Sequence, residues 1–167
     1  MERGGVSERR TEEAGVRILV VYHSQAGHTQ RMAEAVARGA ASIEGASVHL
    51  KRASEAGLED LTACDGLALG SPEYFGTMAG LIKDFFDRTY YPARGRKDVV
   101  KKPYVVFISA GNDGSGALRQ IERICLGYPL KKVYEPVVAQ GEITDEILSR
   151  CYELGQVIAA GCEAGIY

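Results

Sequence analysis

Short runs of consecutive apolar residues alternate along this chain with longer segments in which apolar residues recur every three or four positions. The first run, VRILVVY, is rich in β-branched residues and shows no polar alternation, as in a strand covered on both faces. In the segment that follows, Met32, Val36 and Ala40 fall on one side of a helix. The pattern therefore predicts a buried strand over 16–22 and an amphipathic helix over 29–42.

The same alternation continues to the end of the chain. Further strands are predicted at 46–52, 66–71, 104–110 and 133–138, and further helices at 79–90, 117–126 and 145–161. Strands that alternate with helices in this way form a parallel sheet with right-handed crossovers. The expected fold is therefore α/β, a three-layer doubly wound sheet of five strands in the order 2-1-3-4-5, with the last strand in one piece.

The bulk composition is that of a single globular domain. The chain has 167 residues, 46% of them hydrophobic and 25% charged, with a formal net charge of −2. Such a chain lacks the basic excess of nucleic-acid binders and is long enough to fold without disulfide or metal staples. We expect residues 1–15, a polar stretch of mixed charge, to form a mobile tail and residues 16–167 to form the domain.

The sequence carries no signal for membrane insertion or secretion. No window approaches about 18 consecutive apolar residues, and the N-terminus lacks the apolar core of a signal peptide. The cysteines and histidines show no metal-ligand spacing; the cysteines are Cys64, Cys125, Cys151 and Cys162. We therefore expect no metal site, no membrane partner and a location in the reducing cytoplasm.

Glycine is over-represented, with 20 in 167 residues against a usual share of about 7%. Several of these glycines fall in loops that follow three of the predicted strands. The first loop joins a buried strand directly to a helix, where unpaired N–H groups and the helix dipole attract an anion. Its residues are Ser24, Gln25, Ala26, Gly27, His28 and Thr29. The alternative is an ordinary turn in which Thr29 caps the helix and His28 is merely exposed.

The second and third loops follow the third and fourth strands. The second offers two adjacent aromatic rings to a planar ligand, unless Phe75 packs under the next helix and Tyr74 lies on the surface. Its residues are Pro72, Glu73, Tyr74, Phe75, Gly76 and Thr77. The third loop either lets the backbone approach a ligand closely or forms a flexible turn. Together with the end of its strand it comprises Ser109, Ala110, Gly111, Asn112, Asp113 and Gly114.

In the expected topology these three loops meet at the carboxyl edge of the sheet, where doubly wound folds bind their ligands. One site would then hold a phosphate at the first loop and a planar ring between the other two. The first loop has neither the GxGxxG nor the Walker spacing and contains no Lys. It therefore favours a bound phosphomonoester over phosphoryl transfer.

Three stretches resemble the flavodoxin superfamily: VYHSQAGHTQRMAEAVARGA, LGSPEYFGTMAGLIKDFFDR and VFISAGNDGSG. The resemblance extends from Val16 to about Cys162 and is strongest to the short-chain branch of quinone-reductase-like and FMN-reductase-like proteins, because PEYFGTM precedes a helix carrying FFDR. It implies flavin mononucleotide (FMN) as cofactor. Residues 24–29 would hold the phosphate, 72–77 would flank the ring, and 109–114 would line its ribityl and pyrimidine side.

Two departures from the carrier flavodoxins shape the expected function. Carriers are typically strongly acidic and often cover the flavin with an aromatic residue after the fourth strand, whereas this chain has a net charge of −2 and the loop NDGSG. The resemblance therefore implies an oxidoreductase with NADPH or NADH as donor and a quinone or other small molecule as acceptor, and it is compatible with a homodimer. The alternatives are a one-electron carrier that serves protein partners and a domain that binds no flavin.

Two further features stay open at this stage. Quinone reductases of this kind often have a His downstream of the fourth strand, and here Tyr128 is the candidate catalytic residue in that region, unless it is packed behind a helix-ending glycine. The basic residues within 94–102 form either a solvated linker or a site that attracts the extra phosphate of NADPH or an acidic partner.

Overall fold

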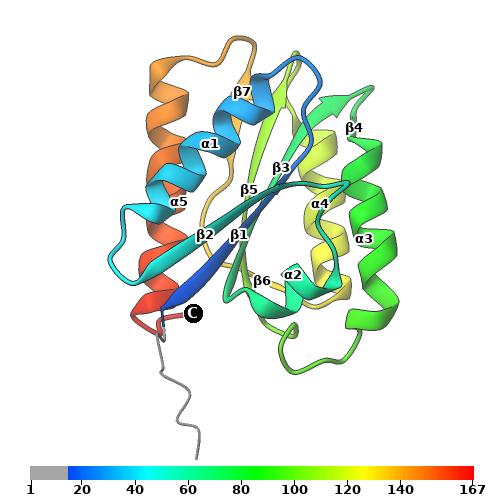
Figure 1. Cartoon of the computed structure of the whole chain (residues 1–167). Helices are drawn as coiled ribbons and strands as arrows, with labels where there is room; N and C mark the ends of the chain where they lie inside the picture. Colours follow the sequence, from blue (N-terminus) through cyan, green and yellow to red (C-terminus); the bar gives the residue numbers. More distant parts are fainter. Residues whose placement is uncertain (1–14) are drawn as a thin grey trace, which may run out of the picture.

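The computed structural model describes residues 15–167. They form twelve helices and strands, arranged as a sheet with helices on both of its faces (Figure 1). Residues 1–14 of the predicted mobile tail lie outside the described residues. In chain order the elements are β1 (Val16–Tyr22), α1 (His28–Ala41), β2 (Ala46–Arg52), α2 (Leu58–Ala63), β3 (Gly66–Tyr74), β4 (Thr77–Met78), α3 (Gly80–Ala93), β5 (Pro103–Ala110), α4 (Ser115–Gly127), β6 (Lys131–Lys132), β7 (Val137–Gln140) and α5 (Asp145–Glu163).

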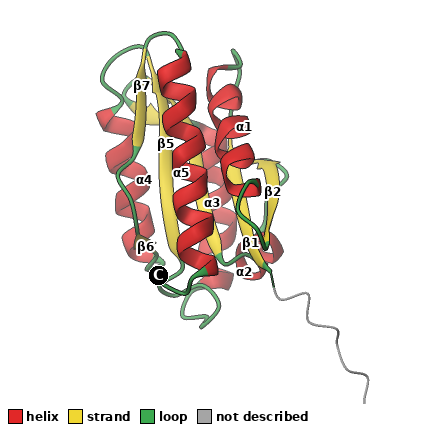
Figure 2. Ribbon diagram, turned by 90° about the vertical axis from the view of Figure 1, so that its left-hand side faces the viewer, coloured by secondary structure: helices red, strands yellow, loops and turns green. Residues whose placement is uncertain are grey.

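The sheet has the expected doubly wound order. Parallel strands run β2-β1-β3-β5, and β6 and β7 both pair with the outer side of β5. In register, Val21 of β1 lies beside Leu69 of β3, which lies beside Val106 of β5. Helices α1 and α5 cover one face and α2, α3 and α4 the other, each over its own apolar cluster (Figures 1 and 2). The predicted three-layer fold and strand order are confirmed.

The last strand of the sheet is interrupted, so the prediction of one strand over 133–138 is wrong. Val133 still donates its N–H to the carbonyl of Tyr104 at 3.2 Å. The pairing then stops until Val137, which lies beside Phe107. Pro136 has no N–H to donate to a ladder, which explains the break at this point of an otherwise strand-like sequence.

Several boundaries near the ligand edge also differ from the sequence pattern. Strand β3 continues past residue 71 to Tyr74 and turns back into β4, so residues expected in a loop form a hairpin. Helix α2 was not predicted because its six residues carry a single buried side chain, Leu61. Helix α3 extends three residues past the predicted end at residue 90, to Ala93, and contains Pro92.

Helices α1 and α5 approach each other at the backbone. A Cβ added to Gly39 of α1 would lie 1.9 Å from the carbonyl oxygen of Tyr152, and one added to Gly155 of α5 would lie 1.9 Å from that of Val36. Such contacts are possible only without side chains. They hold the C-terminal half of α1 closely against α5.

None of the helices within residues 15–167 has both the length and the apolar character needed to cross a membrane.

We expect Gly39→Ala to lower the free energy of unfolding by roughly 2 kcal/mol or more, because the new methyl group forces the two helices apart. Helix propensity alone predicts the opposite, a gain of about 1 kcal/mol. Urea unfolding measures the difference. Gly127→Ala is the matched control, because a Cβ there would meet only Tyr90 at an ordinary 3.9 Å. Equal stability changes in both variants would contradict the close helix contact.

Candidate functional site

A hollow of about 340 Å³ opens at the carboxyl edge of the parallel strands. That volume is within the range of small-molecule sites. All three predicted loops contribute to its wall, which consists of Ala26, His28, Pro72, Glu73, Tyr74, Ser109, Ala110, Gly111, Gly141 and Glu142. Much of the wall is backbone or small side chains, so a flat ligand can lie close to the main chain.

The sequence pattern did not predict that the loop after β7 contributes to the hollow. Gly141 and Glu142 line the hollow because β7 is another parallel strand that ends at the same edge. The N–H of Gly141 donates to the carbonyl of Ala110 at 2.7 Å, and Gly141 has a φ of 81°. The sequence contains a signal for this loop, a glycine three residues after the predicted strand 133–138, but the pattern ends that strand at residue 138 and not at Gln140.

Helix α1 presents its N-terminus beside this hollow. Its N-cap is Gly27, in the left-handed region at φ 95°, and within residues 15–167 no side chain caps the first turn. The N–H of Gly27 itself donates to the Ser24 hydroxyl at 3.1 Å. The N–H groups of the first turn are therefore free to bind an anion, and the dipole of the helix favours one.

Thr29 does not cap the helix, which excludes that alternative. The helix begins one residue earlier, at His28, so Thr29 lies within the first turn and its side chain points to the sheet. Its hydroxyl is hydrogen-bonded to that of Ser109 at 2.8 Å, and both side chains are buried. This bond ties the first turn of α1 to the end of β5.

Helix α4 also begins near the hollow, but its N-terminus is already occupied by two carboxylates. Glu73 accepts the N–H of Ala117 at 3.1 Å, and Asp113 accepts the N–H and hydroxyl of Ser115 at 2.9 and 2.8 Å. The hydrogen bonds from Ser115 lower the pKa of Asp113, so it is ionised at neutral pH. Of these two helices, only α1 offers an open anion site.

The hairpin between β3 and β4 displays Phe75 to solvent. Phe75 has a φ of 52° and Gly76 a φ of 74°, the pattern of a type I′ turn, and Tyr74 pairs with Thr77 across it. The side chain of Phe75 is fully exposed, at 105%. The alternative that Phe75 packs under the next helix is therefore wrong, because the turn projects it away from the core.

Helix α4 holds this hairpin in place. The N–H of Met78 donates to the side-chain oxygen of Gln120 at 3.0 Å. A Cβ added to Gly116 would lie 1.9 Å from the carbonyl oxygen of Gly76. The second and third predicted loops are therefore packed directly against each other.

Tyr74 is half-buried at the wall of the hollow, with its ring edge-on to that of His23 at 6.2 Å between centroids. His23 follows directly after β1. Burial, and secondly the charge of Arg52, lower the pKa of His23, so its imidazole is neutral at pH 7. The rim of the hollow here is aromatic and uncharged.

The remaining predicted residues do not line the hollow. In the first loop these are Ser24, Gln25, Gly27 and Thr29, in the second Phe75, Gly76 and Thr77, and in the third Asn112, Asp113 and Gly114. They shape the loops whose neighbours form the wall.

Tyr128 does not belong to the site. It is 1% exposed, its hydroxyl donates to the carbonyl of Phe86 at 2.8 Å and it shares a hydrogen bond with Thr89 at 2.7 Å. It follows the C-terminal end of α4, whereas the N-terminal end borders the hollow. The structure therefore favours the alternative in which Tyr128 is packed in the core, and not the predicted catalytic role.

The basic segment 94–102 also lies away from the hollow, beyond the C-terminal end of α3 at the opposite edge of the sheet (Figure 1). Within it Arg96 pairs with Asp98 at 2.8 Å. The segment is therefore too remote to bind the phosphate of a nicotinamide cofactor at the candidate site.

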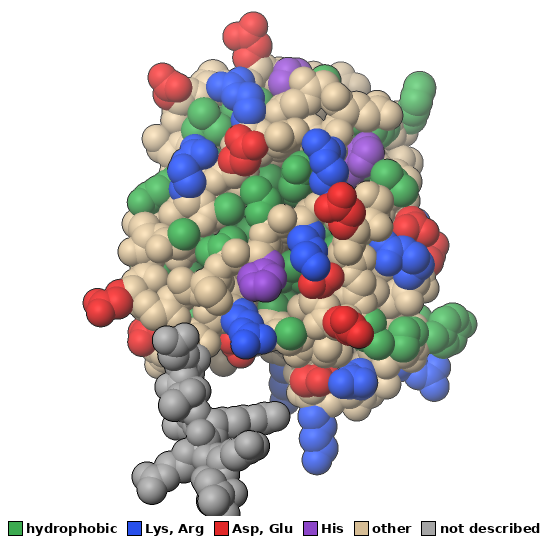
Figure 3. Space-filling model, viewed as in Figure 1, with side chains coloured by type: hydrophobic (Ala, Val, Ile, Leu, Met, Phe, Trp, Pro, Cys, Tyr) green, Lys and Arg blue, Asp and Glu red, His purple; other side chains and the backbone are tan. Residues whose placement is uncertain are grey.

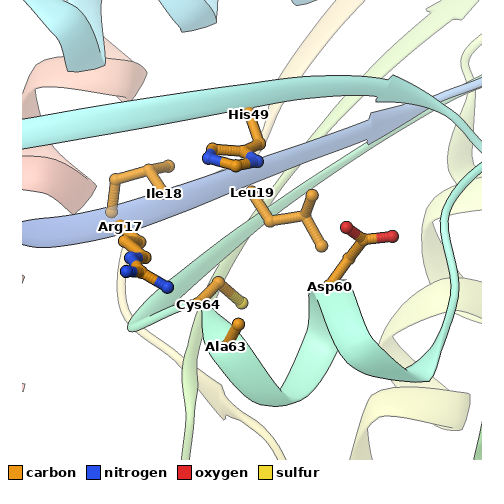
Figure 4. Close-up of a pocket in the computed structure, with 7 residues that line it drawn as sticks. All are labelled: Arg17, Ile18, Leu19, His49, Asp60, Ala63 and Cys64. Carbon is orange, nitrogen blue, oxygen red and sulfur yellow. The ribbon is translucent and has the colours of Figure 1, made fainter.

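A second, much smaller hollow of about 60 Å³ lies beside α2, with His49, Asp60 and Cys64 in its wall (Figure 4). Asp60 is paired with Lys51 at 2.7 Å, and burial raises the pKa of the Cys64 thiol to about 11. The residues described contain no cluster of His, Cys, Asp and Glu suited to a metal. This hollow has neither the volume nor the reactive groups of an active site.

We expect Phe75→Asn to raise the free energy of unfolding by about 0.5–1 kcal/mol. Asn adopts the left-handed conformation at lower cost than a bulky residue, and the exposed ring loses no packing. Thermal unfolding of the chain measures the change. Phe75→Val should instead be less stable than wild type, because a β-branched residue is disfavoured at positive φ. If Phe75→Asn were not more stable than wild type, or Phe75→Val not less stable, the backbone strain at this turn would be refuted.

The buried thiols should react slowly at pH 8. Burial raises the pKa from 9.0 to about 11 for Cys64 and Cys162 and to about 12 for Cys151, and it raises that of Cys125 further. Each thiol then has roughly a hundredfold less thiolate, the reactive form, than a free cysteine. Titration with a chromogenic disulfide should show four slow thiols in the native chain and four fast ones in guanidinium. A fast native thiol would contradict the burial.

Comparison with solved structures supports the fold and extends over almost the whole chain. A flavodoxin from the domain Archaea superposes with a TM-score of 0.76 at 25% identity, covering 88% of this chain and 99% of its own. A flavodoxin, WrbA-like protein from Agrobacterium tumefaciens superposes with a TM-score of 0.74 at 28% identity, covering 90% and 99%.

Curated relatives match over shorter stretches. A flavodoxin of Aquifex aeolicus is 42% identical over 100 residues, 60% of this chain and 53% of the relative. An NAD(P)H dehydrogenase (quinone) of Acidithiobacillus ferrooxidans is 40% identical over 44% of this chain and 46% of the relative. The chain thus matches about half the length of these curated relatives. The model of the NADPH-dependent FMN reductase family matches residues 16–134. The chain belongs to the NADPH-dependent FMN reductase family, as its resemblance to the flavodoxin superfamily implied.

Proposed function

We propose that the chain is an FMN-binding oxidoreductase that takes electrons from NADPH or NADH and passes them to a quinone or another small acceptor. The observation that carries the proposal is the open N-terminus of α1 beside a hollow walled by backbone, together with membership of a family of FMN reductases. A phosphate and a flat ring are the two parts of FMN that such a site fits.

The chain's own residues fit the phosphate of FMN. The free N–H groups at residues 28–30 would donate to its oxygens, and the hydroxyl of Ser24 lies at the start of the same loop. The N-terminus of α4 does not compete, since Glu73 and Asp113 already occupy it. Their two carboxylates would also repel a phosphate placed there, which fixes the orientation of the ligand.

The ring would lie between the hairpin of β3 and β4 and the loop after β5. Pro72 and Tyr74 provide one wall, and Ala110 and Gly111 provide the other. The loop after β5 contributes no aromatic side chain, and residues 111–113 are exposed. One face of a bound ring is thereby left accessible to a second planar molecule.

When bound, FMN supplies the redox chemistry, because it accepts a hydride from a reduced nicotinamide and transfers the electrons onward. The chain positions the partners, and the part of the rim formed by His23 and Tyr74 is uncharged. We propose no protein group as a proton donor. We further propose a cytoplasmic location, supported by four unpaired thiols among the described residues.

A carrier of single electrons between proteins is the second candidate, because a flavodoxin is among the curated relatives. A carrier is expected to show a strongly acidic docking surface. On the face seen in Figure 3, acidic and basic side chains are interspersed instead. The near-neutral charge of −2 also favours the enzyme.

The apoprotein should bind FMN at least tenfold more tightly than riboflavin, because only FMN has the phosphate that the α1 terminus can hold. Quenching of flavin fluorescence during titration measures both affinities. Equal affinities would contradict the assignment of residues 24–29 to the phosphate, and no quenching by either ligand would favour the domain that binds no flavin.

The FMN-loaded chain should oxidise NADPH or NADH catalytically when a quinone is supplied under anaerobic conditions. Absorbance of the reduced nicotinamide measures turnover, and the chain without FMN is the control. A loaded chain that is not reduced by either nicotinamide, but is oxidised rapidly by another redox protein, would favour the carrier instead.

A further inference from the structure

Arg52, at the end of β2, contacts both ends of the loop assigned to the phosphate. Its Nη1 donates to the carbonyl oxygen of Ser24 at 3.3 Å, and its Nη2 donates to the side-chain oxygen of Gln30 at 3.0 Å. Ser24 is the first residue of the loop, and Gln30 lies in the first turn of α1. The guanidinium therefore bridges the two points between which the loop must keep its shape.

The position of the guanidinium is itself fixed by its neighbours. It lies over the ring of Tyr22 at 5.3 Å from the centroid, a cation–π distance. Gln30 donates from its amide nitrogen to Glu34 at 3.1 Å, which turns its oxygen toward Arg52. The adjacent Lys51 is paired with Asp60 at 2.7 Å and does not share this role.

The charge of Arg52 matters because the loop contains no Lys or Arg of its own. A phosphate monoester carries nearly two negative charges at neutral pH. The charge of a guanidinium hydrogen-bonded to the loop attracts that dianion, although exposure to solvent weakens the attraction. The same charge contributes to the lowered pKa of His23, so its field reaches the carboxyl edge of β1.

We propose that Arg52 is a positioning residue for FMN: it holds the loop of residues 24–29 in its anion-binding shape and adds the positive charge that the loop lacks. The inference rests on the proposed function. No sequence motif marks it, because Arg52 lies outside the three loops and reaches the first of them only through the pairing of β2 with β1.

The test compares FMN with riboflavin in apoprotein titrations of wild type, Arg52→Gln and Arg52→Lys. In Arg52→Gln the dissociation constant of FMN should rise about three- to tenfold, and that of riboflavin should stay within about twofold. Arg52→Lys keeps the charge but not the fork of two donors, so its dissociation constant for FMN should fall between those of wild type and Arg52→Gln. Added salt should weaken FMN binding more in wild type than in Arg52→Gln.

Arg38→Gln is the matched control, because Arg38 is exposed in the last turn of α1 and its loss changes the net charge equally. It should bind FMN as wild type does. Thermal unfolding of the apoproteins reports whether Arg52→Gln remains folded.

The outcomes separate this inference from the proposed function. If wild type binds FMN and Arg52→Gln binds it equally well, the role of Arg52 is overturned alone. If Arg52→Gln lost affinity for FMN and riboflavin to the same extent, the role would also be overturned, since such a result indicates a structural contact without preference for phosphate. A wild-type chain that binds neither flavin overturns the proposed function, and the role of Arg52 with it.

Discussion

The candidate site depends on the N-terminus of α1, whose first turn has no side-chain cap among residues 15–167. A buried or half-buried N–H without an acceptor is costly, so a fold that leaves a helix start open must hold it rigidly and supply a ligand. The surrounding contacts achieve the first requirement. Gly39 and Gly155 seat α1 against α5, the hydroxyl of Thr29 joins it to β5, and Arg52 joins it to β2. The contacts of Thr29 and Gln30 hold the first turn itself, and the glycine contacts hold the C-terminal half of the same helix.

The order of strands and the place of the ligand edge could be predicted from the sequence because they follow from the alternation of buried strands and amphipathic helices. Val16–Tyr22 and residues 104–110 are apolar apart from Arg17 and Ser109, which marks them as central strands. Once the order is fixed, the loops after β1, β3 and β5 must be neighbours. The positions of Pro72, Ser109 and Gly111 around one hollow follow from that topology rather than from any local motif.

What could not be predicted depends on interactions between distant residues. The buried position of the Tyr128 side chain is determined by its hydrogen bonds to Phe86 and Thr89, some forty positions away in the chain. Phe75 looks like a core residue by type, and only the turn geometry shows that it is exposed. Gly141 follows a strand whose end the pattern placed two residues too early, and Arg52 reaches the first loop only through the pairing of β2 with β1.

The contact between Gly116 and Gly76 has a consequence for how a ligand enters the site. The backbones of the hairpin and of the start of α4 are in contact, and the two are further joined by the hydrogen bond between Met78 and Gln120. They are therefore held rigidly together. A hairpin held in this way cannot swing open as a lid does. We therefore expect entry and exit along the exposed side of the loop at 111–113, with no conformational opening step for the exchange of small molecules.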